Sequence, residues 1–495
     1  IFHVNHNQLF LAFTCNHQPT YDTRQQQNAD CLEGKQITEF VTTQHRVSDG
    51  LDVDFQRYKI GSNEEFMFQL NRHGFLIQLG QAYYLTGDEK YLNHFVKILD
   101  NWLDTVHCDY KNNSPWRSLE VGMRGDRWLK ALKYIEGTKF FSSELKEKID
   151  KSLLTHIEVL KKAHSGFQKG SNWGIIQDSG LFHIGVYFND NDIISLALKR
   201  LEQETDLQIM FDGFQWEQSN NYHNEVLLVL LDVIIDADKN NIALPEKLKN
   251  KIEKMAEAAL KTVKPNGHNP LFGDSDDTDM RDIMSRCALV FGRSDFKYYG
   301  FDSLDFNTVW QTGNKSIEKY NNIDKIPPSF NNAFLADSGN YILRENQTNT
   351  SNYLLFHNGY TGAGHAHADK LHFDLMIKGR DVLIDAGRYT YLNNAQRRYI
   401  KSPKAHNVCL IDNKQYLNVS SQWETKNPAM AVQYPCFDNE YCTLIGGAHL
   451  GYLKSRNAFV ERKILYIKPD IYVIVDVFKA KGFHTYQQYF HFHSK

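Results

Sequence analysis

The sequence predicts a multidomain α+β protein in which an incomplete (α/α) toroid of helical hairpins is followed by an antiparallel β-sandwich. Its 495 residues exceed what one hydrophobic core usually serves, so two domains are expected. From about residue 63 to 264, apolar residues recur at spacings of three and four, which is typical of amphipathic helices. Beyond residue 333 they alternate with a period of two, which is typical of strands.

These two patterns divide the chain into a toroid domain over residues 1–325 and a sandwich domain over residues 333–495. The loop-like segment GNKSIEKYNNIDKIPPSFNN lies between them. The last residues, YQQYFHFHSK, form another strand-like run. We therefore expect the sandwich, as given, to be incomplete at its C-terminal end.

Helical hairpins account for the first half of the chain. Thr86-Gly87-Asp88 interrupts a long amphipathic pattern and predicts a turn between two helices. Ser142-Ser143-Glu144-Leu145 resembles a capping box and predicts the start of another helix. Further helices are expected at about 192–205, 217–238 and 246–264. Repeated antiparallel hairpins with short turns indicate a toroid or solenoid.

Short alternating segments separated by Gly, Asn and Asp turns follow from about Ala333 and predict the antiparallel sandwich. They read NYILREN, NYLLFHNG, LHFDLMIKG, DVLIDAG, HNVCLIDN and KILYIKPDIYVIVDVFKA.

Composition excludes several classes of function. The formal net charge is −3, so no overall field favours nucleic acid or an anionic membrane as partner. No apolar run approaches the roughly 18 residues of a membrane span, and membrane insertion is not expected. The seven cysteines show no C-x-x-C spacing, which argues against a disulfide framework or a cysteine–zinc site.

The stretch GHAHADKLHFDL concentrates histidine and aspartate in what is otherwise a strand pattern. On a strand, His365, His367 and Asp369 would share one face. Asp385 follows a later predicted strand, and His406 precedes another. Two histidines and a carboxylate are a plausible zinc set, with waters or further ligands completing it. A hydrogen-bonded polar strand edge is the alternative, and the three-part set favours the metal.

The helical half contains polar and aromatic residues in the mixture that sugar stacking and carboxylate binding need. Asn172 and Trp173 stand at a predicted loop-to-helix start, and Tyr222 and His223 lie in the segment FDGFQWEQSNNYHNEVLL. Taken singly, each such residue is more often part of a core or a cap. The candidate substrate-binding residues are Arg72, His73, Trp116, Arg117, Arg124, Trp173, Gln218, His223, Tyr389 and Arg398.

The acidic segment GDSDDTD, residues 273–279, invites comparison with a calcium loop. It lacks the spaced ligands and the terminal glutamate of an EF-hand. We therefore interpret it as a solvated acidic turn.

In their order along the chain, these motifs resemble the heparinase II/III-like polysaccharide lyases, and most nearly the heparinase III branch. The resemblance spans nearly the whole chain and is carried by EEFMFQLNRHGFLIQLGQAYYLTGDEKY, WRSLEVGMR, SNWG, DGFQWEQSNNYH, GHAHADKLHFDLMIKGRDVLIDAG and RRYIKSPKAHNVCLIDN. It implies a lyase that cleaves a uronic-acid polysaccharide by β-elimination and leaves a C4=C5 unsaturated end. A glycosaminoglycan of the heparan sulfate type is the expected substrate; alginate, hyaluronan or chondroitin, and bacterial exopolysaccharides remain open.

The resemblance also implies roles for individual residues. Asn172 and His365 are expected to bind the uronate carboxylate, and Tyr222 to act as acid and base. One divalent ion, expected to be zinc with a mainly structural role, would be bound by His367, Asp385 and His406.

Two features of the expected catalytic group need explanation. A tyrosine acting as base needs cationic neighbours that lower its pKa, and Arg117, Arg124, His223 and Arg398 all qualify. Many relatives place a second histidine base after the cleft asparagine, where this chain has Trp173. Without that base we expect a preference for glucuronate-containing linkages, unless His365 or another residue replaces it.

The resemblance further implies an anionic polysaccharide as partner, a periplasmic or secreted location, and a monomer or dimer. Three rivals remain. H-x-H-x-D also occurs in metallo-hydrolases, although Lys370 follows it here. A non-catalytic carbohydrate-binding protein is the second rival. A glycoside hydrolase is the third, and it would need paired carboxylates, for which Glu120 and Glu217 are the available pair.

Overall fold

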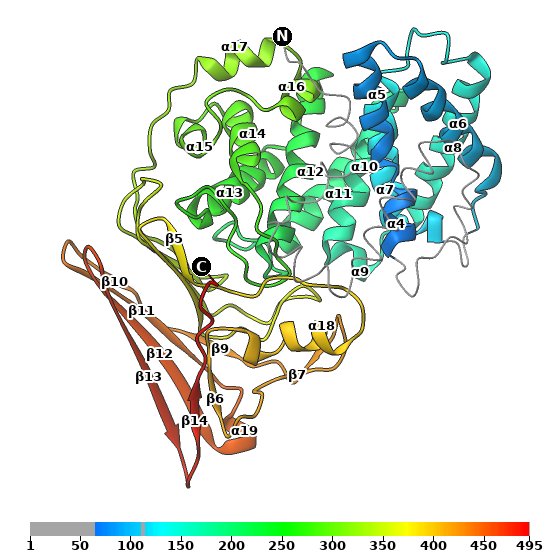
Figure 1. Cartoon of the computed structure of the whole chain (residues 1–495). Coiled ribbons are helices and arrows are strands. Elements are labelled where there is room, and N and C mark those ends of the chain that lie inside the picture. Colours follow the sequence, from blue (N-terminus) through cyan, green and yellow to red (C-terminus); the bar gives the residue numbers. More distant parts are fainter. Residues whose placement is uncertain (1–64, 110–113, 495) are drawn as a thin grey trace. The chain divides into compact units, whose positions relative to one another are not determined.

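The computed structural model describes residues 65–109 and 114–494 (Figure 1). The chain is helical from α4 (Glu65–Asn71) to α17 (Lys315–Asn321), and strands begin with β1 (Ala333–Leu335). The predicted order of a helical half followed by antiparallel sheets is therefore confirmed. Residues 1–64, part of the predicted toroid domain, lie outside the described residues.

By contacts within the chain, the protein divides into two compact units. Among the described residues, the first unit comprises those from 65 to 205 and from 232 to 245, and the second comprises those from 206 to 231 and from 246 to 494. The division at residues 325–333 follows the change in secondary structure and remains a prediction of domain limits.

The described helices of the first unit follow one another along the chain. They are α4, α5 (Gly74–Thr86), α6 (Lys90–Thr105), η1 (Ser114–Trp116), α7 (Ser118–Leu132), α8 (Ser143–Lys162), α9 (Gly166–Lys169), α10 (Asn172–Phe188) and most of α11 (Asn191–Gln208).

The local signals read from the sequence act as expected in this unit. α5 ends at Gly87, whose φ of 69° is left-handed and therefore suits glycine. The Ser142 side chain accepts a hydrogen bond from the backbone N–H of Leu145, which caps α8. α7 and α10 approach closely at Gly122, where a Cβ atom would lie 2.7 Å from Cα of Gln177.

The helices of the second unit precede its sheets. They are α12 (Asn220–Lys239, up to residue 231), α13 (Glu246–Thr262), α14 (Arg281–Phe291), α15 (Ser294–Tyr299), α16 (Phe306–Thr312) and α17. The predicted helices at 192–205, 217–238 and 246–264 correspond to α11, α12 and α13.

Two antiparallel sheets form the sandwich in the second unit. The first follows chain order: β1, β2 (Asn340–Arg344), β3 (Tyr353–His357), β4 (His372–Ile377) and β5 (Arg380–Leu383). The second contains β10 (Phe437–Asp438), β11 (Cys442–His449), β12 (Ala458–Ile467) and β13 (Ile471–Ala480), and β9 (Ala431–Gln433) pairs with β11. The long hairpin of β12 and β13 is plain in Figure 1.

One hydrophobic core lies between these sheets. Leu343 and Phe356 of the first sheet belong to the same buried cluster as Ile445, Val460 and Ile464 of the second. The period-two alternation thus places apolar side chains of both sheets on facing surfaces.

Smaller elements complete the second unit. They are β6 (Cys409–Ile411) paired with β14 (Tyr486–Gln488), β7 (Asn418–Val419) paired with β8 (Thr425–Lys426), α18 (Ala395–Ile400), η2 (Pro403–Ala405) and α19 (Leu453–Arg456). None of the helices in the described part of the chain combines the length and the apolar character needed to cross a bilayer.

Candidate functional site

Two of the residues predicted to be catalytic lie in contact in the second unit. Tyr222 is in the first turn of α12, and His365 lies in the loop before β4. Their rings stack with centroids 3.4 Å apart and an interplanar angle of 17°. Trp423 packs edge-on against His365, with centroids 5.4 Å apart. The fold therefore joins a helix start and a loop that are distant in sequence.

The segment around His365 is not the strand that its alternating pattern predicts. β4 begins only at His372, and the preceding residues form a loop. The backbone N–H of Ala368 bonds to the carbonyl of Lys401 rather than to a neighbouring strand. The carboxylate of Asp369 lies 3.6 Å from Nε2 of His357. The strand prediction fails here because side-chain partners, not a sheet ladder, fix the backbone.

One carboxylate, that of Asp274, joins His365 to His367. Its Oδ2 accepts from Nδ1 of His365 and its Oδ1 from Nε2 of His367, both at 2.9 Å. Arg397 binds the same carboxylate with both terminal nitrogens, Nη2 at 2.7 Å from Oδ2. Burial opposes ionisation of Asp274, but the charge and hydrogen bonds of Arg397 and the two histidines outweigh it and hold its pKa well below the usual range. Asp274 is therefore a buried carboxylate.

The predicted solvated acidic turn is thus wrong for residues 273–279. Asp274 is 0% exposed and Asp276 is 6% exposed. Gly273 makes the turn possible, because its φ is +66° and a Cβ atom would lie 2.6 Å from the carbonyl oxygen of Gln218. Composition could not separate a solvated turn from a buried one, since the arginine that neutralises Asp274 is distant in sequence.

A second chain of hydrogen bonds ends on Tyr222. Its hydroxyl lies 2.7 Å from the hydroxyl of Tyr391, and Nη1 of Arg388 donates to Tyr391 at 3.0 Å. Arg388 also forms a buried ion pair with Asp276, whose Oδ1 is 3.2 Å from Nε. Sequence reasoning missed Tyr391, Arg388 and Asp276. The segment GRYTY, residues 387–391, contains Arg388 and Tyr391 and follows Asp385 closely, so it could have indicated both residues.

The cation nearest to Tyr222 is not one of the four expected from sequence. Burial raises the pKa of Tyr222 well above 10, and the neighbouring Tyr391 and Glu225 raise it further. The charge of Arg388 acts in the opposite direction and lowers it. The Tyr222 hydroxyl is therefore neutral at neutral pH. We call Tyr222, His365, Asp274, Tyr391, Arg388 and Arg397 the tyrosine–histidine cluster.

The other predicted binding residues of the second unit have varied surroundings. His223 is buried, stacks on Phe214 and lies 3.0 Å through Nε2 from the carbonyl oxygen of Met255. Gln218 is buried and donates to the carbonyl of Ser338. Arg398 is exposed on α18 and donates to Asn393. Tyr389 is half-buried in the loop after β5. A role for them in substrate binding remains a prediction.

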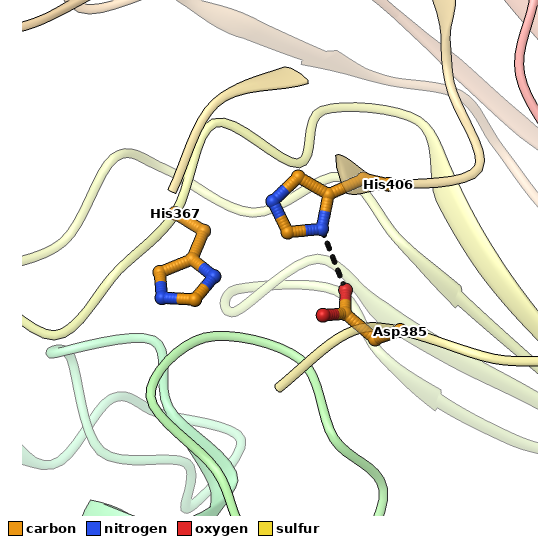
Figure 2. A group of neighbouring side chains, drawn as sticks. All are labelled: His367, Asp385 and His406. Atoms are coloured by element: carbon orange, nitrogen blue, oxygen red, sulfur yellow. Dashed lines mark hydrogen bonds and ion pairs between the residues drawn. The ribbon is translucent and has the colours of Figure 1, made fainter. Parts of the chain in front are cut away.

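The predicted metal ligands His367, Asp385 and His406 come together in the second unit (Figure 2). All three are buried, and each offers one ligand atom within 4.8 Å of the others. Oδ2 of Asp385 lies 2.8 Å from Nδ1 of His406, the contact drawn in Figure 2. They come from the loop before β4, the loop after β5 and the segment after η2.

The unpaired atoms of this group fit a metal ion. Nδ1 of His367 and Nε2 of His406 are buried and have no hydrogen-bond partner among the described residues. Nε2 of His367 is held by the carboxylate of Asp274, which is not one of the three predicted ligands. Histidine metal ligands usually donate their second N–H to a carboxylate in this way.

Asn172, the third residue predicted to be catalytic, belongs to the first unit. It is buried at the first position of α10. Trp173, next to it, packs edge-on against Phe167 and lies under the guanidinium of Arg117 at 4.6 Å. Three of the predicted site residues of this unit are therefore near one another.

Other predicted binding residues of the first unit form its interior. We call His73, Trp102, Trp116, Arg124, Trp128 and His156 the buried aromatic cluster. Nδ1 of His73 accepts from Trp128, and Arg124 donates to His156 at 3.0 Å and to the carbonyl of Pro115 at 2.7 Å.

Arg72 and Glu120 are likewise engaged in the first unit. Nη2 of Arg72 lies 2.9 Å from Oε1 of Glu120, and Nη2 of Arg117 lies 2.6 Å from the same oxygen. Their contacts indicate structural roles, and a role in substrate binding stays a prediction.

The family models that match this chain divide it into an N-terminal and a C-terminal part, as its secondary structure does. Residues 8–298 match the family model described as heparinase II/III N-terminus, and residues 327–495 match that described as heparinase II/III-like, C-terminal. The chain belongs to the heparinase II/III family. A solved structure of heparinase III shares the fold, with a TM-score of 0.73 and 19% identity over 87% of this chain and 66% of that one.

Two curated relatives are heparin-sulfate lyases. That of Bacteroides thetaiotaomicron is 24% identical over 447 residues, which cover 84% of this chain and 59% of the relative. That of Pedobacter heparinus is 23% identical over 412 residues, covering 79% of this chain and 59% of the relative. The chain thus spans about three fifths of the length of these relatives.

Proposed function

We propose that the chain is a polysaccharide lyase that cleaves a uronic-acid polysaccharide by β-elimination, with a heparan sulfate-type glycosaminoglycan as substrate. The observation that carries this proposal is the stacking of Tyr222 on His365, with the buried carboxylate of Asp274 behind the imidazole. The heparin-sulfate lyase relatives support the choice of reaction and substrate class.

The reaction begins at the C5–H bond next to the uronate carboxylate. This proton is weakly acidic, so the carboxylate must be neutralised while charge develops on it. In the proposal Asn172 and His365 bind the carboxylate. Asp274 accepts from Nδ1 of His365, which fixes the ring and leaves Nε2 for the substrate.

Tyr222 transfers the proton in the proposal. The phenolate form of Tyr222, a minor population because burial raises its pKa, takes the C5 proton. The electrons of the C–H bond form the C4=C5 double bond, and the C4–O4 bond breaks. The leaving oxygen then receives the proton from Tyr222. Because Arg388 donates to the Tyr391 oxygen, the Tyr391 hydroxyl is free to donate to Tyr222 and stabilise its phenolate.

We also propose that His367, Asp385 and His406 bind one zinc ion with a mainly structural role. The grouping of the three ligand atoms within 4.8 Å of one another and the buried Nδ1 of His367, which has no hydrogen-bond partner among the described residues, support it. Zinc would crosslink the loop before β4, the loop after β5 and the segment after η2. Through Asp274, the orientation of His367 is coupled to that of His365.

The remaining parts of the proposal concern the surroundings of the enzyme. The partner is an anionic polysaccharide. Because a polysaccharide is encountered in the periplasm or outside the cell, we propose that the enzyme acts there. A glycoside hydrolase receives no support, since Glu120 is buried between Arg72 and Arg117 and is not available as a general acid. A monomer or dimer is proposed.

The test is incubation of the purified protein with a panel of uronate polysaccharides while the absorbance of the new C4=C5 bond is followed. We expect product from heparan sulfate-type chains and less from alginate, hyaluronan and chondroitin. Elemental analysis of the same preparation tests the zinc. Reducing ends without absorbance would indicate hydrolysis and contradict the lyase proposal.

A further inference from the structure

A second set of potential metal ligands lies in the first unit, separate from the residues discussed above. His164 is in the turn between α8 and α9, Asp178 is in α10, and Glu204 is in α11. Each offers one ligand atom, and these atoms lie within 4.8 Å of one another. Nδ1 of His164 is 3.7 Å from Oδ2 of Asp178 and 3.5 Å from Oε1 of Glu204.

Glu204 shows that something is needed in this space. The residue is 0% exposed, and among the described residues no N–H or O–H group donates to its carboxylate, whose neighbour is a second carboxylate, that of Asp178. A buried carboxylate without partners is strongly unfavourable. A Cβ atom at Gly174 would lie 2.5 Å from Oε1, so the carboxylate is directly below the first turn of α10.

Two cations, Arg200 and Lys169, act on the carboxylates of Asp178 and Glu204. The guanidinium of Arg200 is 3.2 Å from Oδ1 of Asp178. Arg200 directs its other contacts to the carbonyl oxygens of Leu160 and Lys161 at the end of α8. Its hydrogen bonds therefore leave the Glu204 carboxylate to be bound by a cation or a proton.

His164 directs a nitrogen at these two carboxylates. Its Nδ1 is buried and has no hydrogen-bond partner in the ranges that the structure describes. An imidazole nitrogen directed at two carboxylates is a donor set for a transition metal.

We propose that His164, Asp178 and Glu204 bind a divalent transition-metal cation, for which Zn²⁺ is the best-matched ion. One imidazole and two carboxylates give three protein ligands, and water completes a tetrahedral shell. The ion joins the turn before α9, α10 and α11. It supports the first turn of α10, where Asn172 begins the helix.

The experiment counts zinc in chelator-treated full-length protein that is reloaded with Zn²⁺ and dialysed. The wild type is compared with Glu204→Gln, with the matched control Glu202→Gln on the same helix, and with His406→Ala. We expect Glu204→Gln to hold one zinc fewer than the wild type and Glu202→Gln to hold the same number. His406→Ala removes a predicted ligand of the sandwich site and should keep the zinc bound by His164, Asp178 and Glu204. The two variants therefore report on the two sites separately.

A second measurement does not require the protein to fold with a substitution at the fully buried Glu204. His164→Ala changes a turn residue, and we expect it to weaken zinc binding at this site at least tenfold in competition with a chelating dye. Zn²⁺ should raise the Tm of the wild type more than the Tm of Glu204→Gln or of His164→Ala. Equal zinc contents and equal affinities in the wild type, Glu204→Gln and His164→Ala would overturn the proposal. A proton shared between the carboxylates of Asp178 and Glu204 would then be the occupant.

Discussion

The buried aromatic cluster of the first unit and the tyrosine–histidine cluster of the second are built from the same kinds of side chain. Both combine histidine, arginine and large aromatic rings, and both drew attention in the sequence. They differ in where the polar atoms point. Arg124 directs its bonds to His156 and to backbone carbonyls. Arg397 and Arg388 instead neutralise buried aspartates beside the ring of His365 and the hydroxyl of Tyr222.

The comparison shows that residue type does not separate a structural site from a chemical one. Burial lowers the pKa of both His73 and His156, so that cluster is neutral apart from its arginine. The tyrosine–histidine cluster includes an ionised carboxylate that orients an imidazole, and hydroxyls that are linked to a guanidinium. Five changes, ordered by their expected effect on activity, test whether this difference has the proposed meaning.

Tyr222→Phe should have the largest effect. Removing the group that transfers the proton should lower kcat by about 10²–10⁴-fold, since general acid–base catalysis is worth that much. The fold should remain, and the Tm should match the wild type within a degree or two. Tyr399→Phe, at an exposed position on α18, is the matched control. More than about a tenth of wild-type turnover in the variant would remove Tyr222 from the mechanism.

Asp274→Asn should reduce both activity and stability. It leaves Arg397 buried without its carboxylate, which typically costs about 3–5 kcal/mol in the free energy of unfolding. Because the pKa of Asp274 is lowered in the folded state, its stabilisation is present above the unfolded pKa of roughly 4 and is lost as the pH falls through the folded value.

Urea unfolding of the Asp274→Asn variant at several pH values is the measurement. The difference between wild type and variant should be constant above about pH 5 and shrink below about pH 4. Asp302→Asn, at an exposed surface pair with Lys325, should show no such difference. A gap that widens on acidification would contradict the assignment.

Tyr391→Phe should have an intermediate effect. Losing a hydrogen bond to a phenolate costs about 1.5–3 kcal/mol, or about 10- to 100-fold in kcat. Without that donor the phenolate of Tyr222 is less stable, so the limb of the pH–rate profile that reports the base should move to higher pH. Tyr441→Phe, at an exposed turn, is the control. An unchanged profile would show that Tyr391 does not act through Tyr222.

The two C5 epimers of the uronate show whether Tyr222 works alone. In glucuronate the C5 hydrogen and the O4 leaving group are on the same side of the ring, whereas in iduronate they are on opposite sides. With Trp173 where relatives have a histidine, we expect kcat/KM to be about tenfold or more higher on glucuronate linkages, a difference of at least 1.4 kcal/mol. Defined oligosaccharides that differ only at C5 are the substrates. Equal values would mean that another residue serves as the second base.

His156→Ala should lower stability and leave chemistry unchanged. It empties a buried site and removes the acceptor for Nε of Arg124, at a cost of about 3 kcal/mol. At temperatures below the onset of unfolding, kcat per folded molecule and KM should each remain within about twofold of the wild-type values. His107→Ala, at an exposed position, is the control. A selective loss of kcat at full stability would place the buried aromatic cluster in the catalytic machinery.

Much of the architecture could be predicted because local signals act locally. The Gly87 turn, the Ser142 cap and the start of α10 at Asn172 depend on spacing and on a few side chains nearby in sequence. The resemblance to the heparinase II/III-like lyases also implied the set His367, Asp385 and His406, and the structure brings these three residues together.

The tertiary structure decided what the sequence could not. Residues 365–369 alternate like a strand, yet Asp274 and Lys401 hold them as a loop. The sequence analysis named Arg398, but it is the neighbouring Arg397 that turns inward to Asp274. Charge and hydrogen-bonding capacity are properties of a residue, whereas burial and partner belong to a position in space. The sequence by itself therefore determined the elements and the chemical types, and the fold determined which side chains became a site.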